Sequence, residues 1–227
     1  MSTDITSTQD LQQQQRQQAP RPSRMPVLFL SHGGPNLLSD EEYPLDRGVG
    51  KGLREIGTYI RNLKPRAILI ASAHWQAEPE VIHVNQQQIT PLIYDFYGFP
   101  DEYYSQTFNH VGSPELARQV VETLGRDGIM ARAVNRGMDH GAWVVLKKAG
   151  LENAGFPIVE MSIFRSDDMQ RHIDLGRALA SLREQGVLII GSGMAVHNLR
   201  DMWGISQVPD YVPAFDKHLD EIVLHTR

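Results

Sequence analysis

Cysteine is absent from this chain of 227 residues. Its absence excludes disulfide bonds, thiolate metal ligands and a cysteine nucleophile, and it suits a reducing compartment. An excess of basic residues is also lacking, because 22 Lys and Arg stand against 27 Asp and Glu, for a formal net charge of −5. No apolar run approaches the roughly 18 residues that span a bilayer, and the first residues contain no apolar core of a secretory signal. We therefore expect a cytoplasmic protein whose partners include neither nucleic acid nor a membrane.

Three common enzyme motifs are missing as well. No glycine-rich loop is followed by the lysine of a Walker A motif, and no GxGxxG follows the first apolar run. The GSG at 191–193 is not a nucleophile elbow, because GxSxG requires glycines where Ile190 and Met194 stand. P-loop enzymes, dinucleotide-dependent dehydrogenases and serine hydrolases are therefore disfavoured.

The first 24 residues differ in composition from the rest of the chain. They contain seven glutamines together with Ser, Thr and Pro, and almost no side chain that a core could bury. Such a segment cannot offset the entropy of its own ordering. We therefore predict a disordered Gln-rich tail over 1–24 and one folded domain over 25–227.

Apolar runs and helical periods alternate along that domain. The runs predict strands at 27–30, 67–73, 81–84, 130–134, 158–164 and 187–190. Helical spacing and cap residues predict helices at 48–63, 113–124, 142–149 and 167–183, and from 210 onward. Strands that alternate with helices favour a single α/β domain, with a mainly parallel central sheet and helices on both faces.

The segment 85–110 has no clean period and is rich in aromatic residues. A loop of this length inside a compact domain is usually functional or disordered, and its aromatic content argues against disorder. Two interpretations stay open for it: these side chains are core, or they form a lid over a planar substrate. In the second case Tyr97 is a candidate substrate-binding residue.

Four of the nine histidines share one context. His32 and His74 directly follow predicted strands, and His140 and His197 lie in turns that contain or follow glycine. The carboxyl ends of parallel strands meet at one edge of a sheet, where open α/β folds bind their ligands. Neutral imidazoles at such an edge predict a transition-metal site. The other five are expected to be solvated or structural: His83, His110, His172, His218 and His225.

Five segments occur in the order of a known family. They are SHGGP at 31–35, SAHW at 72–75, DFYGFP at 95–100, DHGAW at 139–143, and the stretch from GSG at 191–193 to HNLR at 197–200. Together they resemble the class III extradiol ring-cleavage dioxygenases (LigB-like), and among these most of all the DOPA-dioxygenase-like branch. The resemblance extends from Met25 to about Trp203.

The resemblance implies a non-haem metal centre that holds Fe(II), with Zn(II) as the alternative. By position, His32 and His74 match metal ligands and His140 matches a histidine that contacts the substrate. His197 matches a residue treated either as acid/base or as a ligand, and both roles stay open. The implied reaction opens the ring of a catechol such as DOPA with O2 to give a muconic semialdehyde. His140 and His197 are the candidate proton shuttles, and Ser192 is a second candidate substrate contact.

One part of the family pattern has no match in this sequence. The family carries a further His- and Pro-rich segment with another metal ligand, and no such segment precedes Arg227. We therefore expect either a C-terminally incomplete domain or a variant with an incomplete site. Glu160 is a candidate substitute carboxylate, and the alternative for it is a strand-end acid satisfied by partners within the protein. Two alternatives remain: an inactive metal-binding or protein-interaction relative on the same scaffold, and a zinc hydrolase that uses His32 and His74.

Overall fold

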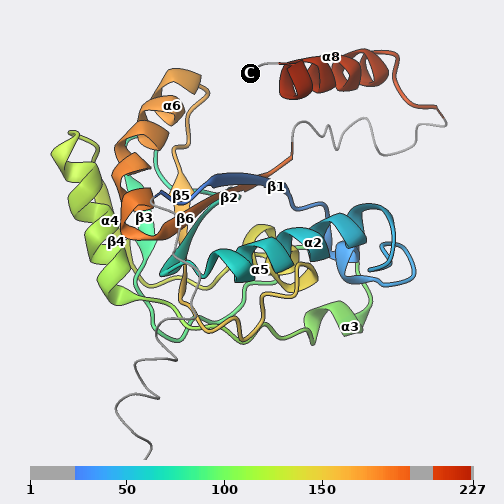
Figure 1. The fold of residues 1–227 in the computed structure, drawn as a ribbon, viewed down its shortest axis with the longest axis horizontal. Helices are drawn as coiled ribbons and strands as arrows, with labels where there is room; N and C mark the ends of the chain where they lie inside the picture. Colours follow the sequence, from blue (N-terminus) through green and yellow to red (C-terminus); the bar gives the residue numbers. More distant parts are fainter. Residues whose placement is uncertain (1–23, 195–206, 226–227) are drawn as a thin grey trace, which may run out of the picture. The chain divides into compact units, whose positions relative to one another are not determined.

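The computed structural model describes residues 24–194 and 207–225. Within these ranges six strands form one sheet in the order β1-β6-β2-β5-β3-β4 (Figure 1). The strands are β1 Val27–Ser31, β2 Ala67–Gln76, β3 Ile82–Asn85, β4 Ala131–Val134, β5 Ile158–Ile163 and β6 Val187–Gly193. All neighbouring pairs are parallel except β3 with β5. The predicted α/β fold with a mainly parallel sheet is confirmed.

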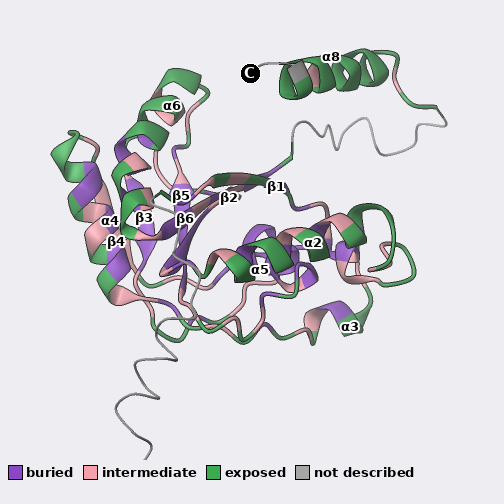
Figure 2. Ribbon diagram, viewed as in Figure 1, coloured by how far each residue is buried: buried purple, intermediate pink, exposed green. Residues whose placement is uncertain are grey.

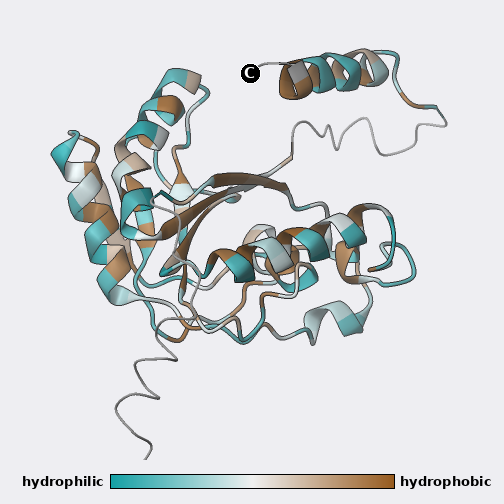
Figure 3. Cartoon of the chain, viewed as in Figure 1, coloured by the Kyte–Doolittle hydropathy of each residue, from teal (hydrophilic) through white to brown (hydrophobic). Residues whose placement is uncertain are grey.

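Helices cover both faces of this sheet. They are η1 Pro35–Leu38, α2 Gly48–Leu63, α3 Asp101–Tyr104, α4 Pro114–Arg126, α5 His140–Lys148, α6 Met169–Ala178 and η2 Leu179–Gln185. α2 and α5 pack on one face, and α4 and α6 pack on the other (Figure 1). Each face therefore has its own apolar core. The hydrophobic strands β2, β5 and β6 are mostly buried between the two cores, whereas the edge strand β1 is largely exposed (Figures 2 and 3).

Local sequence explains where these helices begin and how closely they pack. The Ser113 hydroxyl accepts a hydrogen bond from the backbone N–H of Leu116, as expected of an N-cap residue. In α2, a Cβ atom at Gly57 would lie 1.7 Å from the carbonyl oxygen of Ala149, at the end of α5. Only glycine therefore allows α2 and α5 to approach this closely.

The bounds of four predicted elements are corrected. α5 begins at His140 rather than at residue 142, and the predicted helix at 167–183 is divided into α6 and the 3-10 helix η2. β2 continues to Gln76, so His74 lies within the strand rather than after it. Elsewhere the bounds agree with the predicted periods to within about two residues, the usual uncertainty of element ends, except that β6 continues three residues farther, to Gly193.

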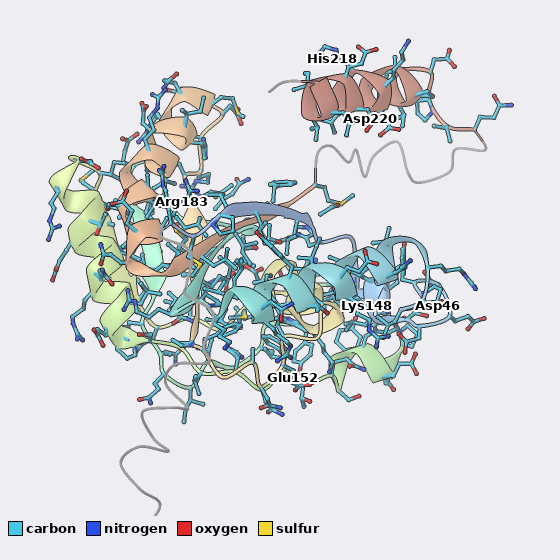
Figure 4. The ribbon with its side chains drawn as sticks, viewed as in Figure 1. Asp46, Lys148, Glu152, Arg183, His218 and Asp220 are labelled. Atoms are coloured by element: carbon cyan, nitrogen blue, oxygen red, sulfur yellow. The ribbon has the colours of Figure 1, made fainter. Side chains whose placement is uncertain are left out.

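Two long basic side chains tie these elements to neighbouring segments (Figure 4). Arg183 of η2 donates from Nε to the carbonyl oxygen of Met25, just before β1, over 2.6 Å. Lys148 at the end of α5 pairs with Asp40 over 2.8 Å, although the lysine side chain is almost fully buried. These contacts hold the entry to β1 and the loop that follows η1.

Met194–Arg227 forms a second compact unit. It contains α8 Tyr211–His225, which confirms the helix predicted from residue 210. His218 lies on this helix, where it is exposed. Across the described ranges we find no helix with the length and apolar character needed to cross a membrane. The predicted Gln-rich tail lies almost wholly outside the described residues and stays a prediction.

Candidate metal centre

Three of the four singled-out histidines converge at the carboxyl edge of the sheet. His32 follows β1, His74 lies near the end of β2, and His140 opens α5. The Nε2 atoms of His32 and His74 are 3.1 Å apart. The His140 ring lies 4.1 Å from the His74 ring and 5.9 Å from the His32 ring, between centroids. The fourth histidine, His197, lies outside the described residues.

Hydrogen bonds determine which nitrogen of His32 faces His74. The Ser192 hydroxyl donates to the carbonyl oxygen of Gly141, and its oxygen lies 3.0 Å from Nδ1 of His32. Because a serine hydroxyl has one proton, Oγ must accept from Nδ1–H of His32. The lone pair of His32 is then on Nε2, the atom directed at His74.

This arrangement fits a bound transition metal. A metal–nitrogen distance of about 2.0–2.1 Å places two neighbouring imidazole ligands roughly 3 Å apart, close to the spacing of the two Nε2 atoms. A ligand histidine usually donates its other N–H to a protein acceptor, as His32 does to Ser192. The donor set of His32 and His74 therefore suits Fe(II) or Zn(II).

Asp95 joins His140 to His74. Its Oδ1 accepts hydrogen bonds from Nδ1 of His140 over 2.8 Å and from the His140 backbone N–H over 3.0 Å. Its Oδ2 lies 3.9 Å from Nδ1 of His74. Burial alone would raise the pKa of Asp95, but the hydrogen bonds from His140 outweigh it and lower the pKa from 3.8 to about 2. Asp95 is therefore ionised, and His140 carries its proton on Nδ1.

Asp95 is the site residue that sequence reasoning missed. The motif at 95–100 contributed only to the family resemblance, and no role was assigned to its carboxylate. The signal that could have identified it is an acid at the start of the DFYGFP motif, between the aromatic residues Tyr94 and Phe96. Ligand atoms of His74, Asp95 and His140 lie within 4.8 Å of one another, so this group could itself contribute to holding a metal ion.

The two predicted substrate contacts occupy different environments. The Tyr97 side chain is 90% exposed, and its contact with substrate stays a prediction. Ser192 is buried, and its hydroxyl is engaged with both His32 and Gly141. The structure thus places Ser192 beside a candidate metal ligand, and its contact with substrate stays a prediction.

Most of the aromatic segment belongs to the core. Phe96, Tyr103 and Phe108 are buried in the cluster beneath α2 and α5, which favours the core interpretation over the lid for these three. The edge of Phe96 also meets the His140 ring, with centroids 5.7 Å apart. Packing of this kind limits the rotation of His140.

The suggestion that Glu160 replaces a metal ligand is wrong. Its two carboxyl oxygens lie 3.3 and 3.4 Å from Nη1 of Arg136, and one of them accepts from the backbone N–H of Asp139. Burial, and after it the negative charge of Asp139, raise the pKa of Glu160 well above its usual value, and Arg136 offsets this only in part. Glu160 therefore belongs to an ionic cluster with Arg136 and Asp139, in which both carboxyl groups are buried and the arginine is partly exposed.

Gly141 is required by the close approach of α5 to these side chains. A Cβ atom there would lie 2.8 Å from Cδ2 of His74 and 2.8 Å from Oγ of Ser72. We expect Gly141→Ala to displace the His74 ring and weaken metal binding about 10–100-fold, the range seen when the surroundings of ligands are altered. Equilibrium dialysis with Co²⁺ measures this. Gly176→Ala is the control, because its Cβ meets open space on α6, and unchanged affinity in Gly141→Ala would contradict the expectation.

Comparison with known proteins agrees with this geometry. The family model described as the catalytic LigB subunit of aromatic ring-opening dioxygenase matches residues 26–226. The protein named 4,5-DOPA dioxygenase extradiol of Beta vulgaris is 39% identical over 199 residues, which are 86% of this chain and 71% of that protein. Its namesake in Escherichia coli K12 is 36% identical over 200 residues, 87% of this chain and 70% of that one.

A solved structure shares the fold. It is that of an uncharacterized protein of Escherichia coli K12, JW3007, with a TM-score of 0.67 and 30% identity over 90% of this chain and 75% of that one. The family resemblance predicted from the five segments is thereby confirmed. On the match over residues 26–226 and the identity to these relatives, the chain belongs to the LigB family of aromatic ring-opening dioxygenases.

Proposed function

We propose that this protein is a non-haem, metal-dependent extradiol dioxygenase that opens the ring of a catechol such as DOPA with O2 to give a muconic semialdehyde. The observation that carries the proposal is the convergence of the His32 and His74 Nε2 atoms at 3.1 Å beside His140. The DOPA class of substrate is supported by the names of the relatives from Beta vulgaris and Escherichia coli.

In this proposal His32 and His74 hold the metal, and His197 is a third ligand or an acid/base. When bound there, Fe(II) would bring a catecholate and O2 together for reaction. The protein's own side chains orient the metal ligands and transfer protons. Ser192 keeps the proton of His32 on Nδ1, so that Nε2 is available to the metal.

His140 is the proposed proton shuttle. Asp95 holds its proton on Nδ1, which leaves Nε2 to accept a proton from a catechol hydroxyl and to return it after ring opening. The His140 side chain is almost fully buried against Phe96, so it is shielded from bulk water.

Oxygen consumption tests the proposal directly. The protein is loaded with Fe(II) under anaerobic conditions, mixed with L-DOPA and exposed to O2, and we expect one O2 consumed per L-DOPA with a yellow product. Zinc-loaded protein is the matched control, because Zn²⁺ has no redox chemistry and should not support oxygen uptake. Stoichiometric iron without oxygen uptake on any catechol would reject the dioxygenase assignment and favour an inactive metal-binding relative.

A further inference from the structure

We propose that Ser72 and the ionic cluster of Arg136, Asp139 and Glu160 act together to position His74 as a metal ligand. We call these four residues the β2 clamp. The inference rests on the metal centre proposed above, and it assigns a role to charged groups that neither bind the metal nor exchange the substrate's protons.

β2 is irregular near His74. The strand pairs regularly with β5 up to Ala71, which lies opposite Met161, and pairing resumes with Gln76 opposite Ile163. Five steps along β2 (71 to 76) thus correspond to two along β5 (161 to 163). Extra residues in a strand bend it and redirect its side chains, a feature common beside active sites. His74 lies inside this bulge, so strand pairing with β5 does not fix its position.

Ser72 fixes the bulge on one side of His74. Its hydroxyl donates to Oδ1 of Asp139 over 2.7 Å, and its oxygen accepts from the backbone N–H of His74 over 3.2 Å. Both Ser72 and Asp139 are fully buried. The backbone of His74 is thus connected through one serine to a carboxylate on the other side of the site.

Arg136 fixes the bulge on the other side. Its guanidinium lies 4.3 Å from the centroid of the Trp75 ring, in cation–π geometry. The same guanidinium is 3.1 Å from Oδ2 of Asp139 and 3.3 Å from Glu160. Asp139 therefore holds the bulge on both sides of His74, at Ser72 directly and at Trp75 through Arg136.

Burial of the two carboxyl groups in this cluster carries a desolvation free energy that their partners must offset. Two fully buried carboxyl groups face one guanidinium, and removing a partner from such a group leaves an uncompensated charge in the interior. Asn85 adds a further constraint, because its amide donates to the carbonyl oxygen of Arg136 over 2.6 Å. A network with this many fixed partners has one low-energy arrangement, and that is what holding a ligand at a set position requires.

Cobalt binding by the full chain tests the β2 clamp without relying on turnover. We expect Ser72→Ala and Arg136→Gln each to weaken Co²⁺ binding about 10–100-fold and to change the visible d–d spectrum of the bound ion. Arg171→Gln is the matched control. Arg171 stacks on Phe164 at 4.5 Å, pairs with Glu80 over 2.7 Å, and has a side-chain exposure of 29%, against 23% for Arg136. The Arg171→Gln protein should bind Co²⁺ with wild-type affinity and with the wild-type spectrum.

Each outcome of this experiment either supports or overturns the β2 clamp. Wild-type affinity and spectrum in both variants would overturn the β2 clamp and leave the proposed dioxygenase function standing. Equal weakening in Arg171→Gln would reduce the effect to general stability and would also overturn it. A wild-type protein that binds no Co²⁺ would remove the metal centre and the clamp together. Ser72→Ala removes a single oxygen atom, so it decides alone if near-UV circular dichroism shows that Arg136→Gln does not fold.

Discussion

Replacing His74 with alanine is expected to abolish stoichiometric metal binding and to reduce oxygen uptake with L-DOPA to the background rate. The substitution removes one of the two nitrogens that converge at 3.1 Å. Changes behind metal ligands typically cost about 10–100-fold in affinity, and loss of a ligand itself should cost more. Metal content after dialysis and an oxygen electrode measure the two effects.

His74 is a cleaner test of the site than His32. The His74 side chain is 31% exposed, whereas His32 is 2% exposed and lies in the buried layer. Substitution of partly exposed residues usually changes the free energy of unfolding little, so His74→Ala should keep its fold and its thermal midpoint. His172→Ala is the control, because that histidine lies on α6 and bonds to its own helix through Asp168. Wild-type metal content and turnover in His74→Ala would contradict the assignment of this ligand.

The sequence was informative where local patterns decide structure. The period of α2, the cap at Ser113 and the apolar runs of the strands depend on residues that are close in the chain, so their positions could be predicted. The convergence of His32, His74 and His140 could also be predicted, because parallel strands bring their carboxyl ends to one edge. Predicting this convergence needs only the identity of the strands and not their detailed pairing.

The details of the site depend on contacts between distant residues. Asp95 bonds to a histidine 45 positions away, and Ser192 to one 160 positions away. No periodicity reports such pairs, so the sequence predicts neither the bond of Asp95 to His140 nor that of Ser192 to His32. Glu160 was misassigned for the same reason, since a strand-end carboxylate can face either the metal or an arginine, and only the structure shows Arg136 beside it.

Asp95→Asn is expected to lower kcat on the order of 10²–10⁴-fold, the usual contribution of a general acid–base, while leaving a folded protein. The carboxylate offers one oxygen to His140 and turns the other toward Nδ1 of His74. An asparagine has a single oxygen, and the His140 backbone N–H would retain it. Its NH2 group would then face the N–H of His74, a donor against a donor, and the negative charge that stabilises a protonated His140 would be lost.

The measurement separates this effect from loss of metal or of fold. kcat and KM for L-DOPA are determined at saturating Fe(II), and we expect the loss to fall mainly on kcat. Asp101→Asn is the matched control, since Asp101 is an exposed acid in the same segment. A kcat within twofold of wild type would show that Asp95 does not act through His140.

The same carboxylate contributes to stability in a defined pH range. Because the pKa of Asp95 is about 2 in the folded protein and 3.8 ordinarily, its ionised form favours folding above about pH 4, and this contribution is lost as the pH falls toward 2. The wild type should therefore lose stability, relative to Asp95→Asn, over that interval. Thermal midpoints of the two proteins that diverge on acidification, instead of converging, would mean that Asp95 is not held by His140 in solution.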